Sequence, residues 1–342
     1  MAKRMKSKIQ PAEMTMTFSF TTSGEDPKES YFIDLSQCAS ILNRRFYRQG
    51  LNWAVSGFKF LTSQGATGQI SVSKLPNTWV MSNAWEKGFR SWMKMNKDAL
   101  EDAPSVKPKF LDFKIYMNED HYSNGFGKNL LPISSATLAS AVQVATPGEW
   151  ESSKLRIPVG VAAPGDTTER EIMAVGPNFG VAGNVAVVSL IDGYAASRGL
   201  PNIQDPNTPG DADDATGLYP DNWMSALQSD GTEQEAAVLT DLTSENNTAP
   251  YPFENGPNQA GGTFADTMYP GGANQLSTLQ IHDSEFLTST TVGGTTHLKG
   301  GNFPCGLVCL NLGAYDGTTL YMQVDLVPGN HRGYLAEPMT EM

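Results

Sequence analysis

The sequence predicts an all-β protein, an antiparallel sandwich with long loops and a few short inserted helices. Two observations predict this class. The 342 residues include 33 Gly and 21 Pro, a composition that favours many short strands over long helices. Most apolar stretches are short and alternate with polar residues, which is the period-2 pattern of strands with one buried face. The strand–helix–strand alternation of a parallel sheet is not visible.

The first third of the chain contains predicted strands at residues 14–22, 51–63 and 68–76, the second of them bent near Gly57. A first helix is predicted between Ser36, as its cap, and Gly50, as its end. A second helix, near residues 81–97, is amphipathic. Its aromatic residues share one face, which we expect to anchor the helix on a sheet, and four cations occupy the other. These cations are Lys87, Arg90, Lys94 and Lys97.

The remainder reads as strand after strand. Predicted strands are residues 109–117, 153–161, 169–176, 183–192, 276–289, 302–313 and 318–328. The tetrapeptide AYDG at 314–317 predicts a hairpin, and the glycines of 291–301 are interpreted as turns. A polar region at about 193–274 contains one predicted helix, 233–242. We therefore expect an eight-stranded jelly roll: a short basic arm, 1–13, and a single domain, 14–342, with a long polar insertion at 193–274.

Charge is distributed unevenly along the chain. Residues 1–115 contain 17 Lys and Arg against 10 Asp and Glu, and residues 116–342 contain 7 against 26, so the net charge of −12 combines +7 and −19. Such asymmetry indicates two surfaces with different partners, although a solvated acidic exterior with clustered lysines by chance explains it equally well. No apolar run is long enough to cross a membrane, and the three cysteines predict reduced thiols from intracellular synthesis.

Signals for catalysis, cofactors or metals are weak. The four histidines form no metal motif, and no GxSxG elbow, P-loop or GxGxxG sequence follows a strand. Cys305 and Cys309 lie four apart in a predicted strand and would share a face, but two further zinc ligands are lacking, so buried thiols are predicted. The acidic loop from Asp205 to Asp214 offers oxygens to Ca²⁺, with a solvated loop as the alternative. We predict no catalytic activity, cofactor or specific metal site.

Nucleic acid is the ligand that the basic third favours. Phosphate binding needs cations on one accessible face, which arms and helix ends provide. Phe46 and Tyr47 could stack on unpaired bases, or else pack within the protein. The helix cations at 87–97 fit either nucleic acid or the acidic surface of a neighbouring copy. The predicted nucleic-acid-binding residues are Lys3, Arg4, Lys6, Lys8, Arg44, Arg45 and Arg48.

A family resemblance is concentrated in three stretches: LNWAVSGFKFLTS at 51–63, ISVSKLPNTWVMSNAWEKGFRSWMKM at 70–95 and LYMQVDLVPGNHRGYL at 320–335. With the basic start and long polar loops, the chain resembles capsid proteins of small circular single-stranded DNA viruses, especially the environmental and crustacean-associated circovirus-like group. The family pattern differs at the amino end, because circoviruses proper have a long arginine-rich arm and this chain has four cations in its first eight residues.

The resemblance implies a jelly roll that assembles into an icosahedral shell of about 60 copies around a single-stranded DNA genome. The basic amino end would face the genome, and loops such as 193–274 would form the exterior and the contacts between copies. It implies a protein of the virion, made in the host cytoplasm with or without passage through the nucleus, without membrane insertion and with no receptor indicated. The alternative is a β-sandwich carbohydrate-binding protein or glycoside hydrolase, with exposed Trp or Tyr and two close carboxylates in a cleft.

Overall fold

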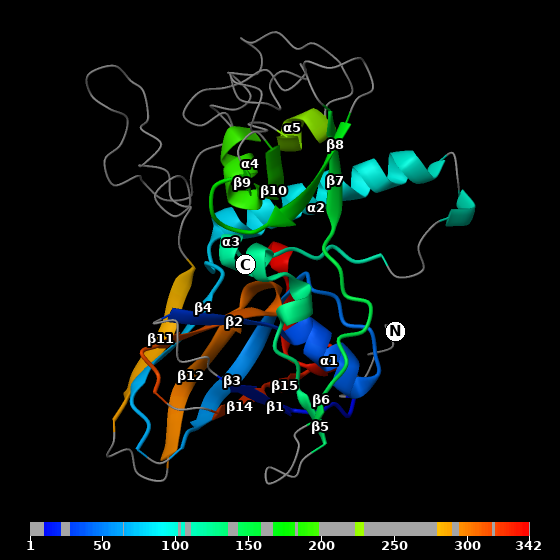
Figure 1. Ribbon diagram of the computed structural model, residues 1–342. Helices are drawn as coiled ribbons and strands as arrows, with labels where there is room; N and C mark the ends of the chain where they lie inside the picture. Colours follow the sequence, from blue (N-terminus) through cyan, green and yellow to red (C-terminus); the bar gives the residue numbers. More distant parts are fainter. Residues whose placement is uncertain are drawn as a thin grey trace. The chain divides into compact units, whose positions relative to one another are not determined.

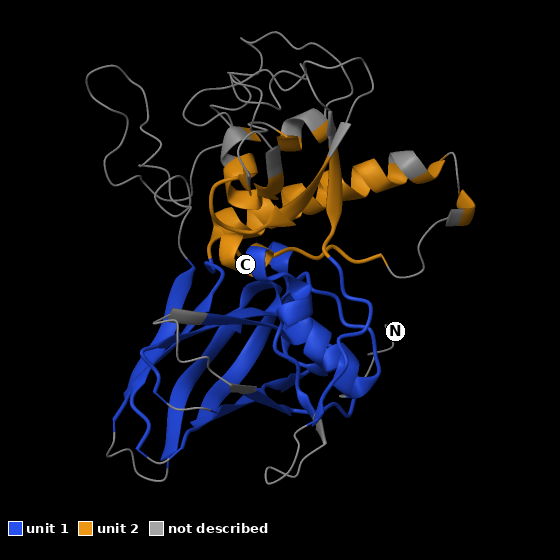
Figure 2. Ribbon diagram, in the orientation of Figure 1, with its two compact units in different colours: residues 1–77, 123–151, 279–342 blue, residues 78–122, 152–278 orange. Residues whose placement is uncertain are grey.

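The computed structural model describes residues 10–21, 28–63, 65–101, 104–106, 111–135, 143–158, 167–181, 184–197, 223–228, 279–288, 294–316 and 319–341. The chain divides into two compact units (Figure 2). The first comprises residues 1–77, 123–151 and 279–342, and the second comprises residues 78–122 and 152–278. The predicted insertion at 193–274 falls within the second unit, and most of it lies outside the described residues. The predicted domain boundaries stay a prediction.

The first unit is built from two antiparallel sheets (Figure 1). Their eight long strands are β1 (Thr15–Thr21), β2 (Lys28–Asp34), β3 (Leu51–Leu61), β4 (Gly68–Lys74), β11 (Gln280–Leu287), β12 (Thr295–Phe303), β13 (Leu307–Gly313) and β14 (Thr319–Leu326). One sheet has the order β1-β14-β3-β12, with β17 (Ala336–Pro338) also paired to β3, and the other has the order β11-β4-β13-β2. Every pairing in both sheets is antiparallel, as the all-β prediction requires.

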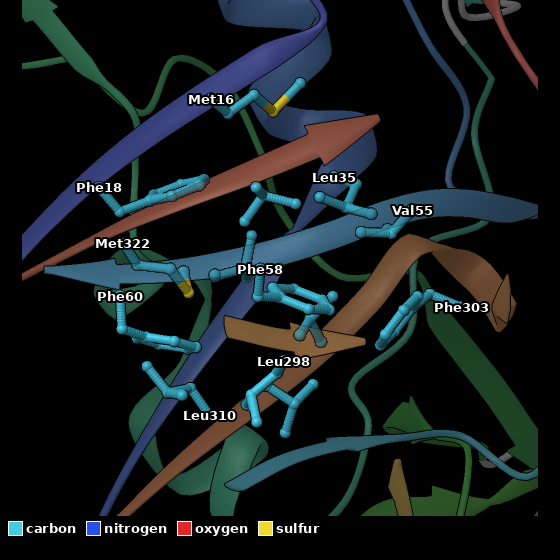
Figure 3. Close-up of a cluster of buried hydrophobic side chains, with 14 of the residues drawn as sticks. Met16, Phe18, Leu35, Val55, Phe58, Phe60, Leu298, Phe303, Leu310 and Met322 are labelled. Atoms are coloured by element: carbon cyan, nitrogen blue, oxygen red, sulfur yellow. The ribbon is translucent and has the colours of Figure 1, made fainter. Parts of the chain in front are cut away.

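The apolar residues of both sheets form one core in the first unit (Figure 3). In β14 the burial alternates residue by residue, because successive side chains of a strand point to opposite faces. In β3 the phase changes: Trp53 and Val55 are buried, and then Phe58 and Phe60. A register shift opposite β14 accounts for this change, since Val55 pairs with Leu326 but Gly57 pairs with Asp325. The predicted bend near Gly57 is therefore confirmed as a bulge.

Of the glycines predicted to form turns at 291–301, Gly300 and Gly301 lie within β12, so that prediction is wrong for these two. Gly300 lies where a Cβ atom would be 2.2 Å from the backbone oxygen of Ser56. The strand therefore approaches the β3 bulge more closely than any side chain allows. Gly300 is thus required by the close approach of β12 to β3, and not by a turn of the chain.

We expect Gly300→Ala to lower the free energy of unfolding by about 2–3 kcal/mol, because backbone atoms of Val55 and Ser56 cannot move away without breaking the β3–β12 pairing. Gly301→Ala is the matched control, since the three atoms nearest its Cβ would all belong to the ring of His282, a side chain that can shift more readily than backbone. Urea denaturation of both variants measures the difference. Equal losses in the two variants would contradict the close-approach explanation.

The AYDG hairpin prediction is also wrong, because β13 and β14 belong to different sheets. The connection is held instead by Asp316, whose carboxylate accepts hydrogen bonds from the backbone N and Oγ1 of Thr67 at 2.6 and 2.9 Å. The predicted strand 302–313 is likewise divided by a 3₁₀ turn, Pro304–Gly306, in which Cys305 has φ +58°. Cys305 and Cys309 therefore do not share a strand face, although both are buried and outside any disulfide.

Helix α1 (Leu35–Asn43) follows β2 directly. Its N-cap is Asp34 rather than the predicted Ser36, because the Asp34 carboxylate accepts the backbone N–H groups of Ser36 and Gln37. The helix ends at Arg44, which adopts the left-handed conformation, six residues before the predicted Gly50. The smaller elements of this unit are the 3₁₀ turns at Phe126–Lys128 and Met339–Glu341, β5 (Ile133–Ser135), β6 (Gln143–Val144), β15 (Pro328–Gly329) and β16 (Gly333–Tyr334).

The second unit combines helices with one mixed sheet. Its elements are α2 (Trp79–Glu101), the 3₁₀ turn Pro104–Val106, β7 (Lys154–Pro158), β8 (Thr167–Met173), β9 (Phe179–Val181), β10 (Asn184–Ser189), α4 (Leu190–Ser197) and α5 (Trp223–Gln228). The sheet order is β7-β8-β10-β9, and its one parallel pair is β8 with β10. Helix α3 (Glu119–Asn124) spans the division between the units.

The structure of the second unit differs from three of the predictions. The described part of segment 109–117 forms no strand, and only Tyr116 makes a bridge, to Met173. The strand predicted at 183–192 ends at Ser189, where α4 begins. The third concerns α2, whose aromatic face is confirmed but packs on other helices and on Phe113 rather than mainly on a sheet. Gly88 lies so close to α4 that a Cβ atom would be 2.4 Å from Leu190 Cδ2. The helix predicted at 233–242 lies outside the described residues.

Candidate nucleic-acid interface

The predicted nucleic-acid-binding residues fall into two groups. The four at the amino end, Lys3, Arg4, Lys6 and Lys8, lie outside the described residues. The other three, Arg44, Arg45 and Arg48, immediately follow α1. Arg44 and Arg48 are exposed, and Arg45 is half-buried. The carboxyl end of a helix carries partial negative charge, so three cations here also have a structural reason to be present.

The first described residues run beside this arginine group. Arg45 Nη1 donates a hydrogen bond to the Pro11 carbonyl at 2.9 Å. The Glu13 backbone N–H donates to Asn43 Oδ1 at 3.0 Å, and the Tyr334 hydroxyl donates to the Glu13 carbonyl at 2.7 Å. These contacts fix the chain at residues 11–13 against the end of α1. Residues 11–13 directly follow the basic arm in the sequence. They therefore link the arm to the place where Arg44, Arg45 and Arg48 lie.

A fourth arginine, missed by the sequence reasoning, joins the same place. Arg332 lies in the loop of the β15–β16 hairpin, and its Nη1 donates to the carbonyl of Phe46, 286 residues away. Tyr47 donates its hydroxyl proton to the Arg332 carbonyl at 3.0 Å. We call Arg44, Arg45, Arg48 and Arg332 the arginine cluster. Only strand pairing at the two ends of the chain brings these residues together, and no local signal marks Arg332.

The two aromatic residues between the arginines have different roles. Tyr47 is fully buried, with its ring centroid 5.9 Å from that of Trp53 and 5.5 Å from that of Tyr334. Of the two possibilities predicted for Tyr47, packing within the protein is therefore confirmed, because its ring belongs to the core and cannot stack on bases. Phe46 is partly exposed, and Arg48 Cζ lies 5.6 Å from its ring centroid. This is a cation–π pair at the surface, with an aromatic face and a guanidinium together.

Neighbouring titratable groups leave the charge of the cluster to its arginines. Burial, with a smaller effect of the Arg332 charge, lowers the pKa of His331 below its ordinary 6.5. The imidazole is therefore neutral at pH 7. Burial raises the pKa of Tyr334 to about 12, so its phenol also stays neutral.

Two cluster arginines occupy backbone conformations that favour glycine. Among the described residues, the non-glycine residues with positive φ are Arg44, Cys305, Ala314 and Arg332. The values are +54° for Arg44 and +50° for Arg332. A left-handed conformation costs an L-residue roughly 1–2 kcal/mol that glycine does not lose. Backbone geometry alone would favour glycine at both positions. The side chains therefore contribute something beyond conformation: Arg332 binds the Phe46 carbonyl, and Arg44 lies at the negative end of α1.

The cations of α2 are mostly engaged within the second unit. Lys87 Nζ donates to Ser197 Oγ at 2.6 Å, which ties α2 to the end of α4. Arg90 pairs with Glu86 one turn earlier. Lys97 Nζ lies 3.9 Å from a Glu101 carboxylate oxygen. Arg90 and Lys97 stay exposed in these pairs, so the two partners predicted for the stripe, nucleic acid and a neighbouring copy, both stay predictions.

Metal binding receives no support from the described part of the chain, where no group of three or more His, Cys, Asp and Glu side chains is placed to hold an ion. Histidines are used structurally instead. His121 Nδ1 accepts the Met117 backbone N–H at 3.1 Å, and His282 Nε2 lies 2.9 Å from the Lys299 carbonyl. The Asp205–Asp214 loop lies outside the described residues, so its calcium binding stays an open prediction. Within the described ranges, every helix is too short or too polar to span a bilayer.

We compared the chain with protein-family models, with curated proteins and with solved structures. The chain matches no protein-family model, no curated protein and no solved structure.

Proposed function

We propose that this protein is a viral coat protein whose first unit is an eight-stranded jelly roll. The order of strand pairing carries the proposal. In chain order, the first long strand pairs with the eighth (β1 with β14) and the second with the seventh (β2 with β13). The third pairs with the sixth (β3 with β12), and the fourth with the fifth (β4 with β11). A single long hairpin with these four pairs becomes a jelly roll when it is wrapped into two facing sheets.

The wrapped hairpin also accounts for the remaining sheet contacts. Rolling places β14 beside β3 and β13 beside β4, and both pairs are antiparallel neighbours here. Jelly rolls of this kind are widely used in viral shells and also in lectins and cupins, so the topology supports the proposal without deciding it. The chain between β4 and β11 supplies the whole second unit, as expected of a coat protein that elaborates its loops.

Electrostatics supports an enclosed polyanion. The basic first third supplies the arm and three of the cluster arginines, while the remainder has a charge balance of −19. In the proposed particle, about 60 copies form an icosahedral shell around single-stranded nucleic acid, DNA by the resemblance. The protein would belong to the virion and would have neither catalytic activity nor a cofactor.

The carbohydrate-binding alternative lacks the feature that it predicted. Among the described residues no tryptophan or tyrosine is fully exposed: Trp53, Trp85, Trp92 and Trp223 are buried, and Trp79 and Trp150 are half-buried. A sugar platform needs an open aromatic face. No observation on the described residues therefore favours this alternative.

Sedimentation velocity and negative-stain microscopy of the purified full-length chain test the proposal. We expect closed particles of uniform diameter, with a sedimentation coefficient far above that of a 36.9 kDa monomer. A monomer that persists from low to high salt and from pH 5 to 8, with no particles on the grid, would overturn it.

A further inference from the structure

We infer that the arginine cluster and Phe46 form a binding site for single-stranded nucleic acid on the folded first unit. This inference rests on the proposed function and deepens it, because it names the ligand of a site on the folded first unit. The site brings together two segments from opposite ends of the chain, residues 44–48 and the hairpin loop at 330–332.

Backbone conformation is the first argument. Arg44 and Arg332 both have positive φ, where glycine would be favoured, and both are exposed. Arg332 holds the Phe46 carbonyl with one guanidinium nitrogen, which leaves its other donors available to a ligand. Guanidinium groups bind phosphate through two parallel hydrogen bonds, so exposed arginines at strained positions fit a phosphate backbone.

The aromatic group gives the second argument, and it selects single strands. Phe46 is partly exposed beside the Arg48 guanidinium, at 5.6 Å from ring centroid to Cζ. An unpaired base can stack on such a pair, whereas bases in a duplex are already stacked on one another. Arg48 and Arg332 both contact Phe46, and cations beside one exposed aromatic residue are an arrangement that binds single strands without reading their sequence.

The experiment measures binding of a fluorescent twenty-nucleotide oligo(dT) and of a twenty-base-pair duplex by anisotropy, with the full-length chain at several salt concentrations. Arg44→Gly and Arg332→Gly are each expected to weaken oligo(dT) binding about eightfold at 50 mM salt and to reduce the salt slope by about 0.7. Phe46→Leu should weaken oligo(dT) binding about tenfold with an unchanged slope. It should leave binding of inorganic polyphosphate, which has no bases, unaffected.

Two controls keep the result specific. Lys299→Gln removes one exposed cation from β12, outside the cluster, and should leave the affinity and the salt slope unchanged. Arg44→Gly should melt within about 4 °C of the parent chain, because glycine adopts the left-handed conformation readily.

The site assignment fails if both glycine variants bind oligo(dT) with the parent affinity and slope. It also fails if Phe46→Leu weakens duplex and single-strand binding equally. Particle formation is scored separately on the same proteins. Particles with unchanged binding in the variants would remove this site and leave the coat function. If the variants bind oligo(dT) more weakly but the parent chain forms no particles, the site stands and the coat function fails.

Discussion

Replacing Trp53 by alanine is expected to lower the free energy of unfolding by about 4 kcal/mol. Trp53 is fully buried, and its ring centroid lies 5.3 Å from that of Tyr334 and 5.9 Å from that of Tyr47. The indole also packs on Gly306, where an added Cβ would be 2.8 Å from Trp53 Cδ1. Alanine would leave a cavity between the start of β3, the Pro304–Gly306 turn and the β15–β16 hairpin.

Trp53→Phe is the matched control. Among the described residues, the Trp53 indole N–H is a buried donor for which no hydrogen-bond partner is found, so phenylalanine removes an unsatisfied group while retaining most of the ring. We expect the phenylalanine variant to lose less than about 1.5 kcal/mol in urea denaturation. A loss as large as that of alanine would contradict the expectation that one aromatic ring retains most of the packing at this position.

Asp34→Asn is the second change with a large expected effect, about 3 kcal/mol of unfolding free energy at pH 7. The Asp34 carboxylate is fully buried and accepts hydrogen bonds from five donors. Oδ1 caps α1. Oδ2 accepts Gln49 Nε2 and Trp150 Nε1, each at 3.0 Å. Asparagine keeps one oxygen for the cap, but its NH₂ group would face the other two donors and leave both unsatisfied.

The stability contributed by Asp34 should also depend on pH. Burial raises the pKa of Asp34 above 3.8, against the lowering effect of its hydrogen bonds from Ser36, Gln49, Gln37 and Trp150. The folded protein therefore holds this proton more tightly than the unfolded chain does. The resulting stability is present in full below pH 3.8 and is lost as the pH rises through the raised pKa. The advantage of the parent chain over Asp34→Asn should thus decrease from pH 4 to pH 7.

Denaturation of the two proteins at each pH measures this difference and cancels the other carboxylates that they share. Trp150→Phe provides the control, since it removes one donor and leaves the carboxylate, at an expected cost of about 1 kcal/mol. Coupling between the two changes in a double-mutant cycle is expected, because the side chains are in contact. A parent advantage that grows as the pH rises would contradict the burial argument for Asp34.

Predictions from local pattern succeeded where one periodicity extends over several residues. The alternation of apolar residues in β14 and the helical spacing of Trp85 and Trp92 in α2 each identify a buried face directly. Predictions failed where short segments decide the path. Pro304–Gly306 is a sharp turn inside an apolar run, and Gly300 lies in a strand although glycines are typical of turns. In both places a contact with a distant strand overrides local preference.

The candidate site shows the same division. Arg44, Arg45 and Arg48 are adjacent in the sequence, so their clustering could be predicted, and their location at the end of a helix followed from the apolar spacing before them. The sequence left base stacking and internal packing open for Tyr47, because its burial depends on Trp53 and Tyr334, which lie on other elements.

The sequence by itself determined the all-β class, the amphipathic α2 and the concentration of positive charge in the first third, because these depend on composition and on short-range periodicity. The tertiary structure alone decided which strands are neighbours, and with them the pairing of first strand with eighth and the arrival of Arg332 beside Phe46. Hydrogen bonds between strands join backbone groups that nearly every residue has. The side chains of a strand therefore do not specify which strand it pairs with.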